Sequence, residues 1–180
     1  MANHVWSRVV VTSDEKELHQ QLEDWFTNLG PTDVRGTVKP LFGDYETYPI
    51  DEIGSKWIYV EDFDNWSENE TYINFCSAWH FPEGYMEQLA AVVLAMDSSS
   101  SLEVRGDEES DDFLVGGYGD INGFSCYMDD SPDRPWEEEF GDDWSGYDNA
   151  INEFYDEVND IQDDLIEQSQ NQINNQRGEE

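Results

Sequence analysis

The chain has 180 residues and a formal net charge of −35, from 43 acidic and 8 basic residues. Nucleic acids and anionic lipid surfaces bind through basic patches, so this balance excludes direct contact with either. No apolar run reaches the length of a membrane span. Aromatic residues make up 14% of the chain, which a disordered acidic segment would lack, so we expect a folded protein. Two cysteines, Cys76 and Cys126, are too few for a disulfide framework and suit the reducing cytoplasm of a host cell.

The first third of the chain predicts a strand followed by a helix. Residues 5–12 are rich in β-branched side chains, which favours a strand. Ser13 is the expected N-cap of a helix whose apolar residues repeat at helical spacing until Gly30-Pro31 ends it. Residues 31–55 combine proline, glycine and scattered aromatics, and we expect a long loop there.

The next elements complete an α+β pattern. We expect strands at 56–60 and 71–78 around a polar turn at 62–70, a helix from Pro82 to about Met96, and a short strand at 102–105. The order strand, helix, strand, strand, helix, strand is the βαββαβ pattern of ferredoxin-like folds, in which two helices cover one face of an antiparallel sheet. Two further strands at 112–118 and 123–127 would add a hairpin at the sheet edge.

Four short motifs give the chain a resemblance to a known family. They are 2-ANHVWSRVVV-11, 53-IGSKW-57, 75-FCSAWHFP-82 and 107-DEESDDFLVGGYG-119. In this order they resemble the YubB-type ferredoxin-like proteins of phages and plasmids. The family often has Asn where this chain has Arg8, and Trp where it has Ile53. The resemblance implies a ferredoxin-like fold and a mobile-element origin, and it implies no activity.

The acidic residues concentrate beyond the region of this resemblance. Residues 107–180 hold 24 acidic and 2 basic residues. We expect a ferredoxin-like domain over 1–128, an acidic aromatic connector over 129–146, an acidic amphipathic helix over 147–172 and a disordered tail over 173–180.

The predicted last helix has two contrasting faces. Its apolar stripe repeats every three or four residues: Ile151, Phe154, Tyr155, Val158, Ile161, Leu165 and Ile166. This stripe would pack on the domain or pair with a second copy in a homodimer. On the other face Asp148, Asn152, Asp156, Asp160 and Asp164 stand four residues apart. Residues 156–167 hold six carboxylates, roughly one per 3 Å of helix axis, against about one phosphate per 3.4 Å along a DNA strand.

These features predict a non-enzymatic acidic protein that mimics nucleic acid. We expect it to inhibit a basic nucleic-acid-binding host protein by occupying its DNA- or RNA-binding surface. The expected contact residues are Asp142, Asp143, Asp148, Asp156, Glu157, Asp160, Asp163, Asp164 and Glu167, with Trp136 and Trp144 as aromatic anchors. The alternative is a structural or self-associating protein whose acidity only serves solubility in a salty environment.

Other chemistries have weaker support in the sequence. No nucleophile elbow, phosphate-binding loop or metal-ligand spacing of His and Cys is present, so we expect no catalysis, cofactor or metal. The stretch 118–129 matches a calcium loop only in part, because Tyr118 occupies the position of its first ligand. Trp57 and Trp79 either fill the core or, with Lys56 and His80, line a pocket, and we expect the core.

Overall fold

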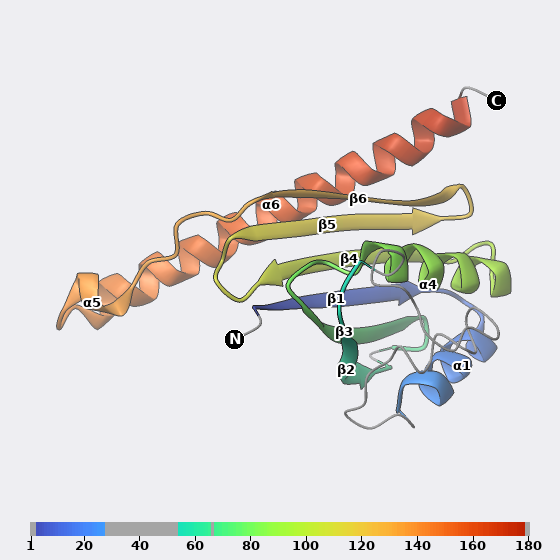
Figure 1. Ribbon diagram of the computed structural model, residues 1–180, viewed down its shortest axis with the longest axis horizontal. Helices are drawn as coiled ribbons and strands as arrows, with labels where there is room; N and C mark the ends of the chain where they lie inside the picture. The colour runs from blue at the N-terminus through green and yellow to red at the C-terminus, as the bar shows by residue number, and fades with distance from the viewer. Residues whose placement is uncertain (1–2, 28–53, 66, 179–180) are drawn as a thin grey trace.

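The computed structural model describes residues 3–27, 54–65 and 67–178 of the chain (Figure 1). These residues form an α+β protein with one antiparallel sheet of six strands in the order β2-β3-β1-β4-β5-β6. The strands are β1 (His4–Thr12), β2 (Ile58–Asp64), β3 (Glu70–Ala78), β4 (Ser101–Glu108), β5 (Phe113–Asp120) and β6 (Gly123–Asp130). The helices are α1 (Lys16–Phe26), α4 (Glu83–Met96), α5 (Glu137–Phe140) and α6 (Trp144–Gly178). The expected order of elements and the expected edge hairpin are therefore both found among these residues.

The core lies between one face of the sheet and helices α1 and α4. Alternate residues of β1, namely Val5, Val9 and Val11, are buried in a single apolar cluster. The same cluster takes side chains from both helices, including Leu22 of α1 and Leu89 of α4. The two helices therefore cover one face of the sheet, as the sequence predicts.

The long helix α6 covers part of the opposite face. Gly116 and Gly119 are three residues apart on β5, so they present opposite faces of the sheet. A Cβ atom at Gly119 would lie 3.4 Å from Ala90 of α4, whereas one at Gly116 would overlap Leu165 of α6. Helix α6 runs along β5 and β6, and its N-terminal end extends with α5 beyond the sheet (Figure 1).

Several predicted boundaries are corrected by the structure. The N-cap of α1 is Glu15, and Ser13 instead accepts a hydrogen bond from the Glu15 amide while donating one to Asp97. Strand β2 begins later than predicted and continues through an irregularity after Val60 into the stretch expected to be a turn. Helix α1 ends at Phe26. The predicted stop at Gly30-Pro31 and most of the predicted loop at 31–55 lie outside the described residues.

The last helix is longer than the sequence indicates. It begins at Trp144 and ends at Gly178, where we expected 147–172 followed by a disordered tail. The tail prediction is wrong for residues 173–178, because Ile173 is buried and anchors an additional turn. The connector at 129–146 also contains the last two residues of β6 and the short helix α5.

The two tryptophans expected in the core lie at its margin. Trp79 is 55% exposed and has a positive φ of 73°, a rare conformation for a bulky residue. Its amide donates to the carbonyl of Asn3, so the backbone here is held by the residue that precedes β1, while the indole is largely exposed. Trp57 is half-buried and stacks on Tyr59 with ring centroids 5.2 Å apart. The core prediction for Trp79 is therefore wrong.

A buried polar network fastens the end of α4 to the start of α1. The Ser13 hydroxyl donates to the Asp97 carboxylate at 2.5 Å, and His19 contacts both the Ser13 carbonyl and the Thr71 hydroxyl. Hydrogen bonds from Ser13 and Ser99 lower the pKa of Asp97. None of the described helices is long and apolar enough to cross a membrane.

Candidate functional site on the last helix

One stripe of α6 is buried against the sheet. Phe154, Leu165, Ile166 and Ile173 are its buried apolar residues, and Val158 and Ile161 are half-buried beside them. Gly116 on β5 makes this packing close, because any side chain there would collide with the helix. The stripe predicted from the sequence therefore packs within the chain, although Tyr155 is 49% exposed.

Polar side chains hold α6 in one register on the sheet. Gln162 donates to the carbonyl of Gly106 at 3.0 Å, and Ser169 donates to the carbonyl of Gly116. The Tyr127 hydroxyl on β6 donates to Gln172. Gln162 and Ser169 are both buried, and each is satisfied by a partner. A buried polar side chain is costly when unpaired, so these bonds favour a single placement of the helix.

The opposite face of α6 is acidic and exposed. Asp156, Asp160 and Asp164 stand four residues apart, Asp148 lies eight residues before Asp156, and all four are exposed. Like charges at this spacing repel, so they oppose the helix that carries them. The buried stripe and its hydrogen bonds to the sheet therefore stabilise a row of charges that an isolated helix would not support.

The structure places the predicted contact residues in two groups. Asp156, Glu157, Asp160, Asp163, Asp164 and Glu167 follow the part of α6 that lies on the sheet, whereas Trp136, Asp142, Asp143, Trp144 and Asp148 lie in the part around α5 and the start of α6 (Figure 1). All of these side chains are exposed, and Trp136 and Trp144 are 60% and 58% exposed.

Two of these carboxylates already have partners inside the chain. Asp163 accepts a hydrogen bond from Arg105 on β4 at 2.5 Å. Asp143 accepts one from the amide of Gly146, three residues on, which is how an N-cap residue satisfies the first turn of a helix. Their charges are therefore partly committed to holding and starting α6, which the sequence did not indicate.

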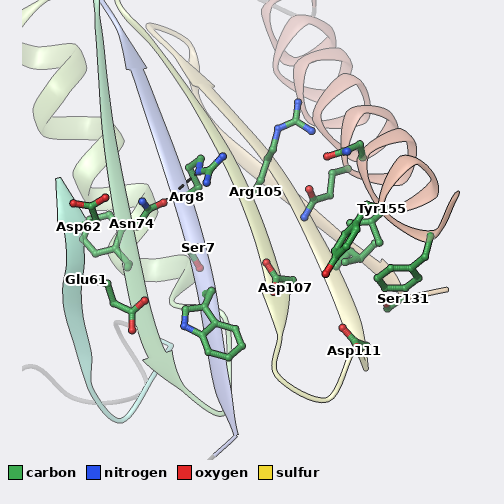
Figure 2. A pocket seen from close by; sticks show the side chains of 17 residues that line it. Ser7, Arg8, Glu61, Asp62, Asn74, Arg105, Asp107, Asp111, Ser131 and Tyr155 are labelled. Atoms are coloured by element: carbon green, nitrogen blue, oxygen red, sulfur yellow. Dashed lines mark hydrogen bonds between the residues drawn. The ribbon is translucent and has the colours of Figure 1, made fainter. Parts of the chain in front are cut away.

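A groove that the sequence did not reveal lies between α6 and the face of the sheet that it leaves open. Its volume is about 470 Å³. The floor comes from alternate residues of adjacent strands: Arg8 of β1 is the direct partner of Asn74 on β3 and Arg105 on β4, and Trp6 is the partner of Asp107. Figure 2 shows Glu61 and Asp62 on the β2 side of this groove and Tyr155 on the α6 side.

The charges in the groove are unevenly satisfied. Arg105 is bound by Asp163, and Arg8 donates to Asn74 at 3.3 Å. Asp107 lies between these arginines and Asp111, and its carboxylate accepts no hydrogen bond from the described part of the chain. Its pKa is raised to about 6, mainly because surrounding protein atoms reduce its hydration although the residue remains exposed, and also because Asp111 repels its charge, while Arg8 lowers it.

The described residues contain no cluster of acids, histidines or cysteines with metal-site geometry. The stretch with a partial calcium-loop pattern forms the turn between β5 and β6. There Asp120 accepts hydrogen bonds from the backbone and side-chain amides of Asn122, and Gly123 has a φ of 136°. These are ordinary features of a hairpin turn.

No known family model, curated protein or solved structure matches this chain.

Proposed function

We propose that the chain is a non-enzymatic nucleic-acid mimic, which inhibits a basic protein by occupying the surface that holds DNA or RNA. The observation that carries this proposal is the exposed row Asp148, Asp156, Asp160 and Asp164 on a helix fixed to a sheet. A solvated acidic loop would serve solubility equally well. A rigid row instead presents charges at fixed positions, which is what a groove built for phosphates recognises.

The dimensions of α6 support the proposal. Its 35 residues make a rod of about 50 Å at 1.5 Å per residue. That length corresponds to about 15 base pairs of duplex at 3.4 Å each. Six carboxylates between residues 156 and 167 place roughly one charge per 3 Å of the rod, close to the phosphate spacing of one strand.

The N-terminal end of the rod adds apolar contact area. Trp136 and Trp144 are more than half exposed on either side of the acidic helix α5. Phe140 and Tyr147 pack edge to face at 5.8 Å and brace this end. Exposed tryptophans beside charges are typical anchors of protein interfaces, so this end would fix the orientation of the partner.

The strand order and the resemblance to a mobile-element family also support the proposal. The order β2-β3-β1-β4, with α1 and α4 on one face, supports a ferredoxin-like arrangement extended by β5, β6 and α6. The resemblance to YubB-type proteins supports a phage or plasmid origin and action in a host cytoplasm. Mobile elements gain from blocking host nucleic-acid enzymes.

Self-association through the apolar stripe of α6 is the weaker candidate. Phe154, Leu165 and Ile166 are buried against the sheet of their own chain. A dimer built on this stripe would require α6 to leave the sheet and break the hydrogen bonds of Gln162 and Ser169. A solubilising role alone would not require the acidic helix to be held in one register by the hydrogen bonds of Gln162 and Ser169.

Competition with DNA tests the proposal. A labelled duplex is bound to purified basic proteins, such as a histone-like protein, a polymerase and a restriction enzyme, and this chain is added. We expect release of the duplex from at least one of them, with an affinity that weakens strongly between about 50 and 200 mM salt. No release from any protein, or release that salt leaves unchanged, would contradict the proposal.

A further inference from the structure

The charged side chains that line the groove between α6 and the open sheet face are mostly acidic. Four carboxylates line it: Glu61, Asp62, Asp107 and Asp111. Its two arginines are already engaged, Arg105 by Asp163 and Arg8 by Asn74. The groove thus offers more uncompensated negative than positive charge to a ligand.

Two of the four carboxylates have hydrogen-bond partners within the chain. Asp111 accepts a hydrogen bond from Arg134 at 3.5 Å, and Asp62 accepts one from the amide of Phe63. The other two are less well paired: among the described residues, Glu61 has a long contact of 3.5 Å from the Tyr59 hydroxyl, and the Asp107 carboxylate accepts no hydrogen bond. Glu61 on β2 and Asp107 on β4 stand on strands three spacings apart, roughly 14 Å between backbones.

Aromatic rings complete the site. Trp6 on β1 lies between these two strands, as the direct backbone partner of Asp107, and its indole is exposed. Tyr155 enters from α6 on the other side (Figure 2). A cation over the face of tryptophan or tyrosine gains electrostatic attraction, and a planar guanidinium can also stack there.

We propose that this groove binds an arginine side chain of the basic partner, with the guanidinium paired with the Asp107 carboxylate and stacked against Trp6. The inference rests on the proposed function, because it takes the partner to be a basic protein. It adds a pocket of defined chemistry to an interaction otherwise made by a charged rod. Arginine suits the site better than lysine because its planar group can bind one carboxylate through two parallel hydrogen bonds and can also stack on an indole ring.

Asp107 gives this pocket a dependence on pH. Its pKa of about 6 is set by groups from every neighbouring element: Asp111 beyond β4, Arg8 on β1, and the surrounding groove walls. Arg105 and Glu61 also face the groove, as does Tyr155 on α6. A bound guanidinium favours the ionised carboxylate, so binding is strongest above pH 6 and weakens as pH falls through 6.

The experiment titrates the full chain with an arginine whose amino and carboxyl ends are blocked. Binding is followed by NMR of the indole N–H groups, with Trp6 assigned from the Trp6→Phe variant. We expect saturable shifts of the Trp6 signal, and none with blocked citrulline, which has the same shape without the charge. Asp107→Asn should weaken binding roughly tenfold at pH 7, equivalent to one charge-assisted contact.

A matched variant distinguishes arginine binding in the groove from nonspecific electrostatic attraction to the acidic surface. Glu17→Gln removes one exposed charge from α1, on the other face of the sheet, and should leave arginine binding unchanged. Equal weakening by Asp107→Asn and Glu17→Gln, or equal binding of citrulline, would overturn the pocket. If the chain displaces DNA but does not bind blocked arginine, the pocket alone is contradicted. If it binds blocked arginine but does not displace DNA, the proposed function alone is contradicted.

Discussion

Gly116 on β5 lies so close to Leu165 on α6 that a Cβ atom added to the glycine would overlap the leucine. The same Cβ would stand 2.8 Å from the carbonyl oxygen of Gln162 and 2.9 Å from the amide of Ile166. The missing side chain therefore sets the distance between helix and sheet. It also lets Ser169 reach the carbonyl of Gly116, which fixes the acidic face outward.

Substitution of Gly116 by alanine should loosen the helix from the sheet. The new methyl group meets helix backbone, which cannot move aside as a flexible side chain can, so we expect a loss of about 1–3 kcal/mol in unfolding free energy. Gly119→Ala is the control, because its Cβ meets mainly the Phe124 ring and the Ala90 methyl. Urea denaturation measures both variants, and an equal effect would show that the contact with α6 is not special.

Asp97 should stabilise the folded protein at pH values above the ordinary pKa of a carboxyl group. Its pKa is lowered in the folded protein, first by the Ser13 hydroxyl, so its contribution is present above about pH 4 and is lost as pH falls through the folded pKa. Asp97→Asn should cost about 1.5–3 kcal/mol at pH 7. Thermal unfolding from pH 7 downward should show the difference between wild type and variant shrinking, and a constant difference would contradict this role.

Asp107 should act on stability in the opposite direction. Its folded pKa of about 6 lies above its unfolded value near 4, so the folded state binds the extra proton between these pH values. Stability from this group is thus lost as pH rises from about 4 through 6. Asp107→Asn should match wild type near pH 4 and unfold at a higher temperature at pH 7. A variant that is less stable at pH 7 would refute this.

The repulsion along the acidic face should make the protein sensitive to salt. The Debye length falls from about 10 Å at 0.1 M to about 3 Å at 1 M, which screens carboxylates one helical turn apart. We expect the midpoint of thermal unfolding to rise with sodium chloride, and to rise less in a variant with Asp156, Asp160 and Asp164 changed to asparagine. Equal salt responses in the two proteins would place the repulsion elsewhere.

Most of the fold could be predicted from hydrophobic periodicity. The structure buries alternate residues of β1 and one apolar face of α4, and both patterns can be read from the spacing of their hydrophobic residues. The Asp120–Gly123 turn also marks the edge hairpin. These signals are local, so they are visible in a single sequence.

The placement of α6 could not be predicted in the same way. It depends on Gly116, which has no side chain to signal burial, and on Gln162 and Ser169, which are polar and yet buried. For Trp79 the error is the reverse, because a large aromatic side chain expected in the core is exposed. The groove at Trp6 and Asp107 combines side chains from strands β1 to β5 with α6, and no sequence motif records that combination.

The central claim is that the exposed row of α6 competes with nucleic acid for a basic protein. The most direct test is displacement of a labelled duplex by two variants with the same net charge. One neutralises the row (Asp156→Asn, Asp160→Asn, Asp164→Asn), and the other neutralises exposed acids elsewhere (Glu15→Gln, Glu17→Gln, Glu87→Gln). We predict that the first variant displaces the duplex with at least roughly tenfold lower affinity, about 1.4 kcal/mol, while the second equals wild type. Equal displacement by both variants would contradict the account.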